Sequence, residues 1–399
     1  MPSLKRRFAL SLLLLGILLV ATISFTFNSA SDSKQVESFY VGVTFCGNSS
    51  AEAKLLIDRV KDYTNLFVLQ SYPISKNVTA ITEICDYAIA AGLHIIVSFA
   101  CFEDHSQLFW LDNATQQWGD RLLGVYYYDE PGGTQIDFNW ARCFSNLKRD
   151  NSSMYRAHAA AMEAFLNSSL AKDYDLAAKV YVDIIRNDTG ICVLKQRPLT
   201  VFTSDYALYW FDYLGGYDVV LAQLGWNETL SRSISLIRGA ARLQNKSWGT
   251  IITWRYDEPP YLDSGENIYQ QMVTSYDAGA KYVLVFNYPQ IEGNPYGILG
   301  DEHFEALARF WNYVRLNPQA RGSIEVEAAL VLPGNYGWGM RRPKDFIWYW
   351  QSGERAQKLW ELSLSLISEY DIHMDVVYDN PDFPTAGKYS KIYHWSDYA

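Results

Sequence analysis

The chain has 399 residues, of which 49% are apolar and 20% are charged, and its formal net charge at pH 7 is −10. This length and composition predict a globular protein with a large core, arranged as one big domain and a smaller one. They disfavour binding to nucleic acid, since no run of Lys or Arg occurs beyond the N-terminus and phosphate backbones require a positive surface. The 13 Trp, 29 Tyr and 19 Phe suit contact with sugar rings and equally suit a large core.

The N-terminus has the pattern of a membrane anchor. Lys5, Arg6 and Arg7 precede an uncharged, mostly apolar segment, residues 8–27, which at about 1.5 Å per residue can cross a hydrocarbon core of about 30 Å. The positive flank predicts that the rest of the chain is extracellular, joined to a single transmembrane helix by a polar stalk that completes residues 1–37. The alternative is a signal peptide cleaved near Ser29 and Ala30, which would give a secreted protein.

Acceptor motifs for N-glycosylation support export. The pattern Asn-X-Ser/Thr begins at Asn48, Asn77, Asn113, Asn151, Asn167, Asn187, Asn227 and Asn245. Such motifs are typical of exposed loops in secreted chains. The sequence therefore predicts an exported glycoprotein.

The five cysteines contain no C-x-x-C pair, which excludes zinc ribbons and thioredoxin-like redox sites. Because an exported protein can form disulfides, we expect a bond between Cys143 and Cys192, which flank the same insertion. The six histidines form no H-x-H or H-E-x-x-H set, so no metal site is expected from them. No cofactor is expected. No G-x-S-x-G motif occurs, so the nucleophile elbow of an α/β-hydrolase is not expected either.

From residue 38 onward, strand-like and helix-like segments alternate in chain order. The expected strands are 38–46, 65–72, 93–100, 122–131, 199–205, 217–226, 248–259 and 280–290. The expected helices are 51–63, 79–92, 105–118, 228–243, 265–277 and 301–316, with a longer helical excursion over 137–187. Eight such units predict a (β/α)8 (TIM) barrel over residues 38–320. A doubly wound open sheet is the alternative.

The α/β pattern starts again near residue 320. Strands are expected at 325–333, 374–379 and 389–395, with a helix at 352–370, which predicts a small C-terminal α/β domain over residues 321–399. The glycine-rich segment "LPGNYGWGMRRP" lacks the G-K-[ST] ending of a phosphate loop. We expect it to be an aromatic loop packed beside the barrel mouth.

Two of the expected strands end on the same tetrapeptide, Tyr-Asp-Glu-Pro, in "RLLGVYYYDEPGG" and "WGTIITWRYDEPPY". They are strands four and seven, whose carboxyl ends lie at the rim where barrel enzymes build their active sites. Pro131 and Pro259 would end the strands. Two carboxylates across a barrel mouth can hydrolyse a glycosidic bond, so we predict Glu130 as the acid/base and Glu258 as the nucleophile.

Alternation along strand four places Tyr126, Tyr128 and Glu130 on one side and Tyr127 and Asp129 on the other. Asp129 and Asp257 would then orient the substrate or cap loops. A register shift of one residue would exchange the roles of Asp and Glu.

A Glu ending strand four and a Glu ending strand seven resemble the large clan of retaining (β/α)8 glycoside hydrolases. The small domain after the barrel is similar to the one that follows the barrel in the β-galactosidases of heat-loving microbes. The resemblance implies a carbohydrate substrate and the roles assigned to Glu130 and Glu258. It departs from the clan at Asp129, where the clan usually has an Asn that binds the sugar 2-hydroxyl.

Other candidate substrate contacts follow from the expected strand ends. They are Gln70, Tyr72, Tyr128, Asp205, Gln223, Trp226, Trp254, Arg255, Tyr256, Asn287 and Tyr288. The main functional hypothesis is an exported glycoside hydrolase. One alternative is a non-catalytic carbohydrate-binding or cell-surface barrel, and another is a divalent-metal site built from Asp129, Glu130, Asp257 and Glu258.

Overall fold

The structure is a computed structural model that describes residues 38–102, 105–137, 140–167, 171–226 and 228–398. The described residues from Tyr40 onward form one compact unit. The expected transmembrane helix and stalk lie outside the described residues. Among the residues that are described, no helix is both long enough and apolar enough to cross a bilayer.

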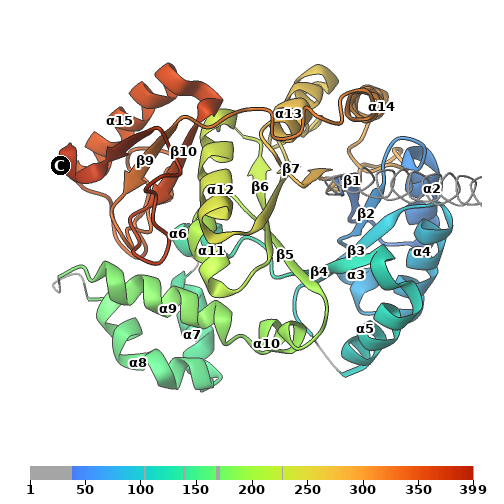
Figure 1. The fold of residues 1–399 in the computed structure, drawn as a ribbon. Helices are drawn as coiled ribbons and strands as arrows, with labels where there is room; N and C mark the ends of the chain where they lie inside the picture. The colour runs from blue at the N-terminus through green and yellow to red at the C-terminus, as the bar shows by residue number, and fades with distance from the viewer. Residues whose placement is uncertain (1–37, 103–104, 138–139, 168–170, 227, 399) are drawn as a thin grey trace, which may run out of the picture. The chain divides into compact units, whose positions relative to one another are not determined.

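Eight parallel strands close into a barrel, each paired with the next along the chain and β8 paired with β1 (Figure 1). The strands are β1 (Tyr40–Phe45), β2 (Leu66–Leu69), β3 (His94–Phe99), β4 (Leu122–Tyr127), β5 (Thr200–Asp205), β6 (Val219–Leu224), β7 (Ser247–Ile252) and β8 (Tyr282–Val285). The predicted (β/α)8 barrel is confirmed, and the open sheet is excluded.

The helices around the barrel begin at residues that the sequence marks as caps. Ser49 accepts a hydrogen bond from the Glu52 N–H at the start of α2, and Asn77 does the same for the first turn of α4. The helices are α2 (Ser50–Val60), α3 (Tyr72–Ser75), α4 (Val78–Ala90), α5 (His105–Trp118), α11 (Tyr209–Gly215), α12 (Leu230–Gln244), α13 (Gly265–Asp277) and α14 (Asp301–Leu316). The predicted ranges of α5, α13 and α14 are confirmed.

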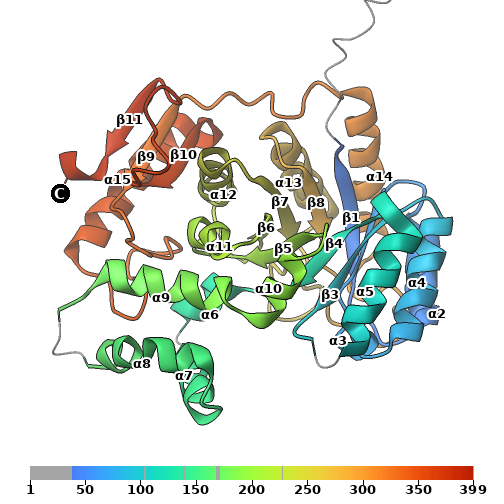
Figure 2. The same ribbon diagram turned by 60° about the horizontal axis from the view of Figure 1, so that its bottom comes forward.

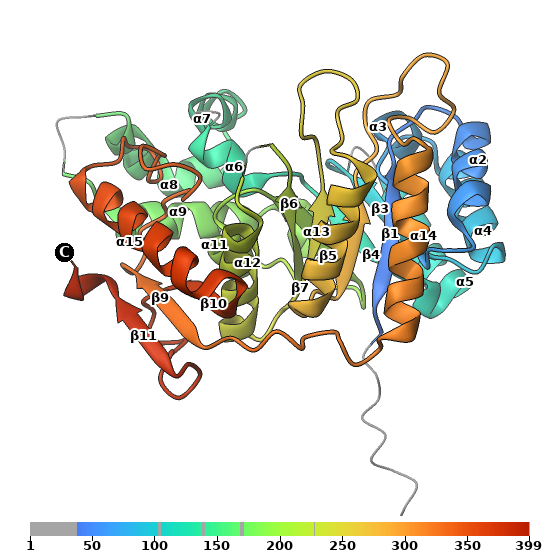
Figure 3. The same cartoon turned by 90° about the horizontal axis from the view of Figure 1, so that it is seen from above.

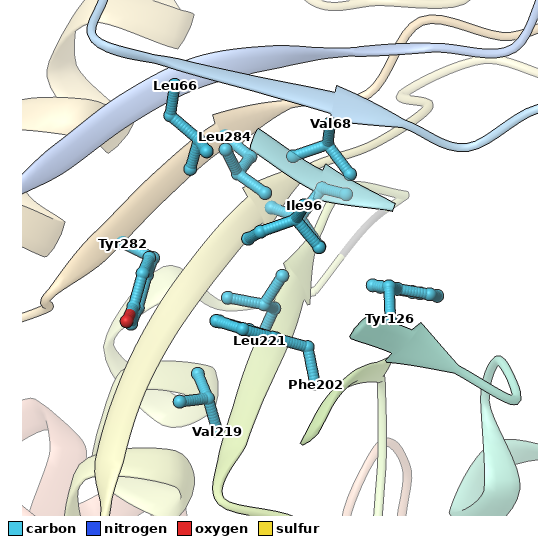
Figure 4. Packing of buried hydrophobic residues seen from close by; sticks show 10 residues of the cluster. Leu66, Val68, Ile96, Tyr126, Phe202, Val219, Leu221, Tyr282 and Leu284 are labelled. Atoms are coloured by element: carbon cyan, nitrogen blue, oxygen red, sulfur yellow. The ribbon is translucent and has the colours of Figure 1, made fainter. Parts of the chain in front are cut away.

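The inward-facing side chains of the strands fill the barrel (Figure 4). They are Leu66, Val68, Ile96, Tyr126, Phe202, Val219, Leu221, Ile251, Tyr282 and Leu284. Because this layer closes the barrel interior, a ligand can enter only beyond the strand ends.

The excursion after β4 consists of five helices: α6 (Pro131–Ile136), α7 (Trp140–Arg149), α8 (Ser153–Phe165), α9 (Tyr174–Arg186) and α10 (Thr189–Lys195). Helix α9 packs against α11, α8 packs against α9, and α7 packs against α8 and α6 (Figure 2). The first of these helices, α6, is the one that matters for the site, because it begins directly after the acidic pair of β4.

The C-terminal segment forms a parallel sheet in the order β10-β9-β11, with β9 (Ala328–Leu332), β10 (Met374–Tyr378) and β11 (Lys391–His394). Helix α15 (Glu354–Tyr370) connects β9 to β10, and β10 packs against barrel helix α12 (Figure 3). A buried ion pair joins them, since Arg238 Nε lies 2.7 Å from Asp375 Oδ1 with side-chain exposures of 3% and 0%.

The expected disulfide is not present. All five cysteines are free, including Cys143 on α7 and Cys192 on α10. Cys143 lines an apolar cavity beneath α7, while Cys192 is exposed and its thiol donates to the Arg186 carbonyl oxygen. The two residues flank the insertion in sequence, but their helices do not bring the sulfurs together.

Candidate active site

A cavity of about 520 Å³ opens at the carboxyl ends of the barrel strands. Its charged lining residues that the structure describes are Asp129, Glu130, Asp137, Glu228 and Arg341, so among them acidic groups outnumber basic ones four to one. The remaining lining residues are Gln70, Ser204, Tyr206, Gln223, Trp226, Ile251, Thr253, Trp254, Phe286 and Tyr288. A polar floor with aromatic walls is typical of a small-molecule site.

The end of β4 brings both members of its acidic pair to this cavity. The strand stops at Tyr127, and both Tyr128 and Glu130 adopt left-handed backbone conformations, with φ of 57° and 54°. Such angles are uncommon for residues other than glycine, and here they end the alternation on which the sequence-based choice between Asp129 and Glu130 relied. The structure therefore places Asp129 and Glu130 in the same cavity instead of on opposite sides of a strand.

Two hydroxyl groups hold the carboxylate of Asp129 in place. Its Oδ1 accepts hydrogen bonds from the Tyr126 hydroxyl and from Ser204 Oγ, the latter at 2.9 Å. The Tyr126 hydroxyl also lies 2.7 Å from Ser204 Oγ. Water can reach Asp129 through the cavity, but dense surrounding protein raises the pKa of its carboxyl by desolvation, an effect that the two hydroxyl donors oppose.

Glu130 has the properties of a general acid. Its Oε1 accepts a hydrogen bond from Gln223 Nε2 at 2.7 Å, and its backbone N–H donates to the Ser204 carbonyl oxygen at 3.0 Å. Burial, followed by the neighbouring negative charge of Asp129, raises the pKa of Glu130 to about 7. A carboxyl group with such a pKa keeps its proton near neutral pH and can donate it to a leaving group.

Asp205 is fully buried and does not line the cavity. Its carboxylate accepts the backbone N–H groups of Gly132 and Gly133, at the start of α6, together with those of Tyr206 and Ala207. A Cβ atom on Gly133 would lie 2.1 Å from the Tyr206 ring. Asp205 therefore fixes the position of α6, and through it Glu130, without facing the site itself.

The structure does not bring Glu258 to the cavity. Strand β7 ends at Ile252, and not at residue 259 as expected, because the chain turns away after Thr253 and Trp254. The loop beyond folds on itself: the N–H of Tyr261 donates to the Glu258 carbonyl oxygen, and the N–H of Arg255 donates back to Tyr261. Glu258 and Asp257 are exposed on this loop, outside the cavity lining that Glu130 shares.

Aromatic rings from β6, β7 and β8 form one wall of the cavity. Trp254 stacks on Tyr288, with ring centroids 6.0 Å apart and an interplanar angle of 14°, and its indole N–H donates to the Tyr288 carbonyl oxygen. Trp226 meets Trp254 edge-on at 6.1 Å. Trp226 and Tyr288 remain 42% and 48% exposed, so both rings present a face that a sugar could cover.

The other candidate contacts take different positions. Gln70 and Asp129 line both the main cavity and a neighbouring one of about 340 Å³, which Tyr72 and Tyr128 also line. Tyr256 is exposed outside the main cavity, and Arg255 donates to the Trp226 carbonyl oxygen from a side cavity. Asn287 is 1% exposed, and its Oδ1 accepts the N–H of Ile298.

Five further residues line the cavity but were not predicted from the sequence. They are Glu228, Asp137, Arg341, Tyr206 and Ser204. Glu228 follows β6 in the loop before α12, and burial raises its pKa to about 7, against the opposing charge of Arg341. Ser204 could have been predicted from the sequence, because it directly precedes Asp205, a candidate at the end of β5.

Arg341 comes from the C-terminal glycine-rich segment. It donates to Asp137 Oδ1 at 2.7 Å and to Asp345 Oδ1 at 2.8 Å, and the Tyr206 hydroxyl also donates to Asp137, at 2.6 Å. The expectation that this segment packs beside the barrel mouth is confirmed. The segment also supplies a basic group to the site, because Arg341 is the basic residue among the described residues of the cavity lining.

No group of three or more His, Cys, Asp or Glu side chains able to hold a metal ion occurs within the described parts of the chain. The four-carboxylate arrangement considered from the sequence is not assembled, because Asp257 and Glu258 lie outside the cavity that contains Asp129 and Glu130.

Comparison with solved structures identifies similar folds. The chain is similar to a GH5_18 protein from Streptomyces cattleya, determined in complex with GlcNAc, with a TM-score of 0.54 and 10% identity over 91% of this chain and 100% of that one. A family 1 β-glucosidase from Thermotoga maritima has a TM-score of 0.41 and 10% identity, over 70% of this chain and 98% of that one.

A truncated 3-deoxy-D-arabino-heptulosonate 7-phosphate synthase from Thermotoga maritima has a TM-score of 0.37 and 9% identity, over 71% of this chain and 91% of that one. No protein-family model matches the sequence, and neither does any curated protein. At this level of identity the similarity shows the fold alone, a (β/α)8 barrel of the kind that glycoside hydrolases have.

Proposed function

We propose that the protein hydrolyses glycosidic bonds of a carbohydrate bound in the cavity at the barrel mouth, with Glu130 as the general acid. One observation carries this proposal: Glu130 faces the cavity with a pKa raised to about 7. A carboxyl group that stays protonated near neutral pH is what departure of a sugar leaving group requires.

The walls of the cavity support a carbohydrate as the ligand. Trp226, Trp254 and Tyr288 present apolar faces, while Gln70 and Gln223 supply amide groups nearby. Because sugars offer apolar ring faces and a rim of hydroxyl groups, this combination recognises them well. The glycosidase-like barrels that resemble this chain in fold agree with the proposal.

The retaining mechanism expected from the sequence needs a second carboxylate opposite Glu130. Glu258 has no such position, since its loop lies outside the cavity lining. We therefore propose hydrolysis with a catalytic role for Glu130 only. The experiment below tests whether Glu258 also has one.

The test is a screen of a soluble fragment beginning near residue 38 against a panel of aryl glycosides. We expect Glu130→Gln to lower kcat by about 100-fold or more, most strongly on substrates with poor leaving groups, and Glu258→Gln to leave kcat close to wild type. Full activity of Glu130→Gln on every cleaved substrate would reject the assignment. Loss of activity in Glu258→Gln would restore the two-carboxylate assignment made from the sequence.

Binding of oligosaccharides without any hydrolysis, measured by calorimetry, would instead identify the protein as a non-catalytic carbohydrate-binding barrel. The decisive readout is a binding isotherm for wild type together with the absence of released sugar after prolonged incubation.

We further propose that the protein is exported and glycosylated, with an N-terminal anchor as the sequence pattern predicts. Exposure of the acceptor asparagines supports this. Those that the structure describes are all exposed, and they are Asn48, Asn77, Asn113, Asn151, Asn167, Asn187 and Asn245. Expression in a glycosylating host, followed by endoglycosidase treatment, should lower the apparent mass in several steps, and an unchanged mass would refute glycosylation.

A further inference from the structure

Asp129 raises the pKa of the neighbouring general acid Glu130, and the structure also holds the Asp129 carboxylate in a defined orientation. Its Oδ1 accepts hydrogen bonds from the hydroxyls of Tyr126 and Ser204, and within the described parts of the chain no side chain donates to its Oδ2. Asp129 lines the main cavity beside Glu130. A carboxylate that lines a cavity and has one oxygen held by two hydroxyl groups can accept a hydrogen bond from a ligand with its other oxygen.

Among the described residues of the cavity lining, the other acidic side chains are less suited to direct attack on the sugar than a free, ionised carboxylate is. Of these acidic residues, Asp137 is engaged by Arg341 and by the Tyr206 hydroxyl. Burial raises the pKa of Glu228 to about 7, so part of this group is protonated near neutral pH. The residues that follow β7 in the cavity wall are Thr253 and Trp254, neither of which is a carboxylate.

Asp129 itself is poorly placed for direct attack. Retaining and inverting mechanisms need two carboxyl groups that flank the bond, at separations of about 5 to 9.5 Å, with the second one on the opposite side of the sugar from the acid. Asp129 and Glu130 are consecutive residues of one turn, so both approach the substrate from the β4 side of the cavity. A nucleophile that belongs to the substrate itself is compatible with this arrangement.

We propose that the substrate supplies it: the site hydrolyses glycosides of 2-acetamido-2-deoxy sugars, whose own amide oxygen attacks the anomeric carbon while Asp129 orients the amide. This inference rests on the proposed function and names its substrate class. The N–H of the acetamido group donates to Asp129 Oδ2. Asp129 is then a catalytic residue, and Tyr126 and Ser204 are positioning residues that act through it.

Water is the only reactant that the hydrolysis needs besides the glycoside. The amide oxygen forms a bond to C1 as the bond from C1 to the leaving oxygen breaks, and the Glu130 proton moves to the leaving oxygen. This gives a cyclic oxazolinium ion, whose positive charge is stabilised by the Asp129 carboxylate. Water then adds to C1, its proton returns to Glu130, and the ring opens to restore the acetamido group.

The surroundings of the pair suit an acetamido group. The cavity wall includes the apolar side chains Ile251 and Phe286 together with Trp254, which can enclose its methyl group. The excess of acidic over basic lining residues disfavours anionic sugars, since like charges repel at short range. A neutral sugar that carries an N–H donor matches both properties.

The closing experiment compares 4-nitrophenyl 2-acetamido-2-deoxy glycosides with the matching 2-hydroxy glycosides, using the wild-type soluble protein. We expect cleavage of the acetamido substrates and rates at least about 100-fold lower for the 2-hydroxy ones. Equal rates for both series would overturn the inference and leave the proposed function standing. Cleavage of neither series, on any panel member, would overturn both.

Fluorine substitution on the acetamido methyl tests whether its oxygen is the nucleophile. Each added fluorine withdraws electrons from the amide oxygen, so kcat should fall progressively from acetamido to trifluoroacetamido substrates. A kcat that does not respond to fluorination would overturn the inference.

Variants at Asp129 test its part in the reaction. Asp129→Ala should lower kcat on acetamido substrates by about 100-fold, and should weaken binding of a thiazoline analogue of the oxazoline by about tenfold or more. Asp62→Asn, an exposed carboxylate outside the cavity, serves as the control and should change neither value. Unchanged thiazoline affinity in a folded Asp129→Ala protein would refute the role of Asp129.

Discussion

At the scale of single residues, two backbone angles decide which carboxylates reach the cavity. Tyr128 and Glu130 both have positive φ, so the chain turns after Tyr127 and presents Asp129 and Glu130 together. Pro131 indicates from the sequence that the strand ends here. The left-handed turns themselves have no such signal, because Tyr and Glu rarely adopt them and do so here only within the completed fold.

The pH dependence of hydrolysis follows from the surroundings of Glu130. The groups that act on it are the carboxylates of Asp129 and Asp137, which together with burial raise its pKa, and the Gln223 amide, which lowers it. Since the acid must be protonated, kcat should fall as pH rises through about 7. A pH–rate profile with its alkaline limb near pH 4.5, the ordinary range of Glu, would contradict this.

Gln223→Met should move the alkaline limb of the pH–rate profile to higher pH. The Gln223 amide donates to Glu130 Oε1 and so favours the anion, and its loss should raise the pKa of Glu130 by about one unit, equivalent to about 1.4 kcal/mol. The measurement is the pH profile of kcat for both proteins, with unfolding temperatures recorded to confirm that the variant is folded. A limb displaced to lower pH would show that Gln223 does not stabilise the anion.

At the scale of elements, strand ends were the least predictable feature. The sequence-based ranges overran β4 and β7 because aromatic and apolar residues continue past the last paired residue. For β7 this difference affects a candidate site residue. The strand ends at Ile252, and Glu258 lies on an exposed loop beyond it. Hydrophobic periodicity indicates which residues are buried and not which are paired in a sheet. After β7 burial and strand pairing end at different residues.

Asp205 provides a test of how α6 is positioned. Asp205→Ala would leave the N–H groups of Gly132, Gly133, Tyr206 and Ala207 without their acceptor. Because unsatisfied buried donors cost about 1–3 kcal/mol each before relaxation, we expect the free energy of unfolding to fall by about 2–4 kcal/mol. Activity should fall as well, since Glu130 directly precedes this helix.

Urea unfolding would measure the effect, with Asp173→Ala as the matched control. Asp173 caps α9 from an exposed position through one hydrogen bond, to the Leu176 N–H, so its loss should cost about 1 kcal/mol. Equal costs for the two variants would show that Asp205 is an ordinary cap.

At the scale of the whole molecule, the C-terminal sheet takes part in the site. Its glycine-rich segment delivers Arg341 to the cavity, and the ion pair between Arg238 and Asp375 fastens β10 to α12. Arg238 also donates to the carbonyl oxygens of Ile372 and Met374. The barrel and the sheet are therefore expected to unfold together.

Asp375→Ala tests this coupling. Breaking a buried ion pair by removing one partner typically costs about 3–5 kcal/mol, because the remaining charge is left uncompensated. We expect a single unfolding transition at a lower urea concentration, monitored by both fluorescence and circular dichroism. Asp379→Ala, at an exposed ion pair with His394, should change stability little; two separate transitions in wild type would contradict the coupling.

The sequence by itself determined the barrel, the order of its elements, the small C-terminal α/β segment and the strand end that carries Glu130. These features depend on hydrophobic periodicity and on helix caps, which are local properties of the chain. Only the tertiary structure decided that Asp129 joins Glu130, that Asp205 lies beneath the site, and that Glu228 and Arg341 line the cavity where Glu258 was expected. Those outcomes depend on backbone turns and on contacts between residues up to about two hundred positions apart, such as Asp137 with Arg341, which no local pattern encodes.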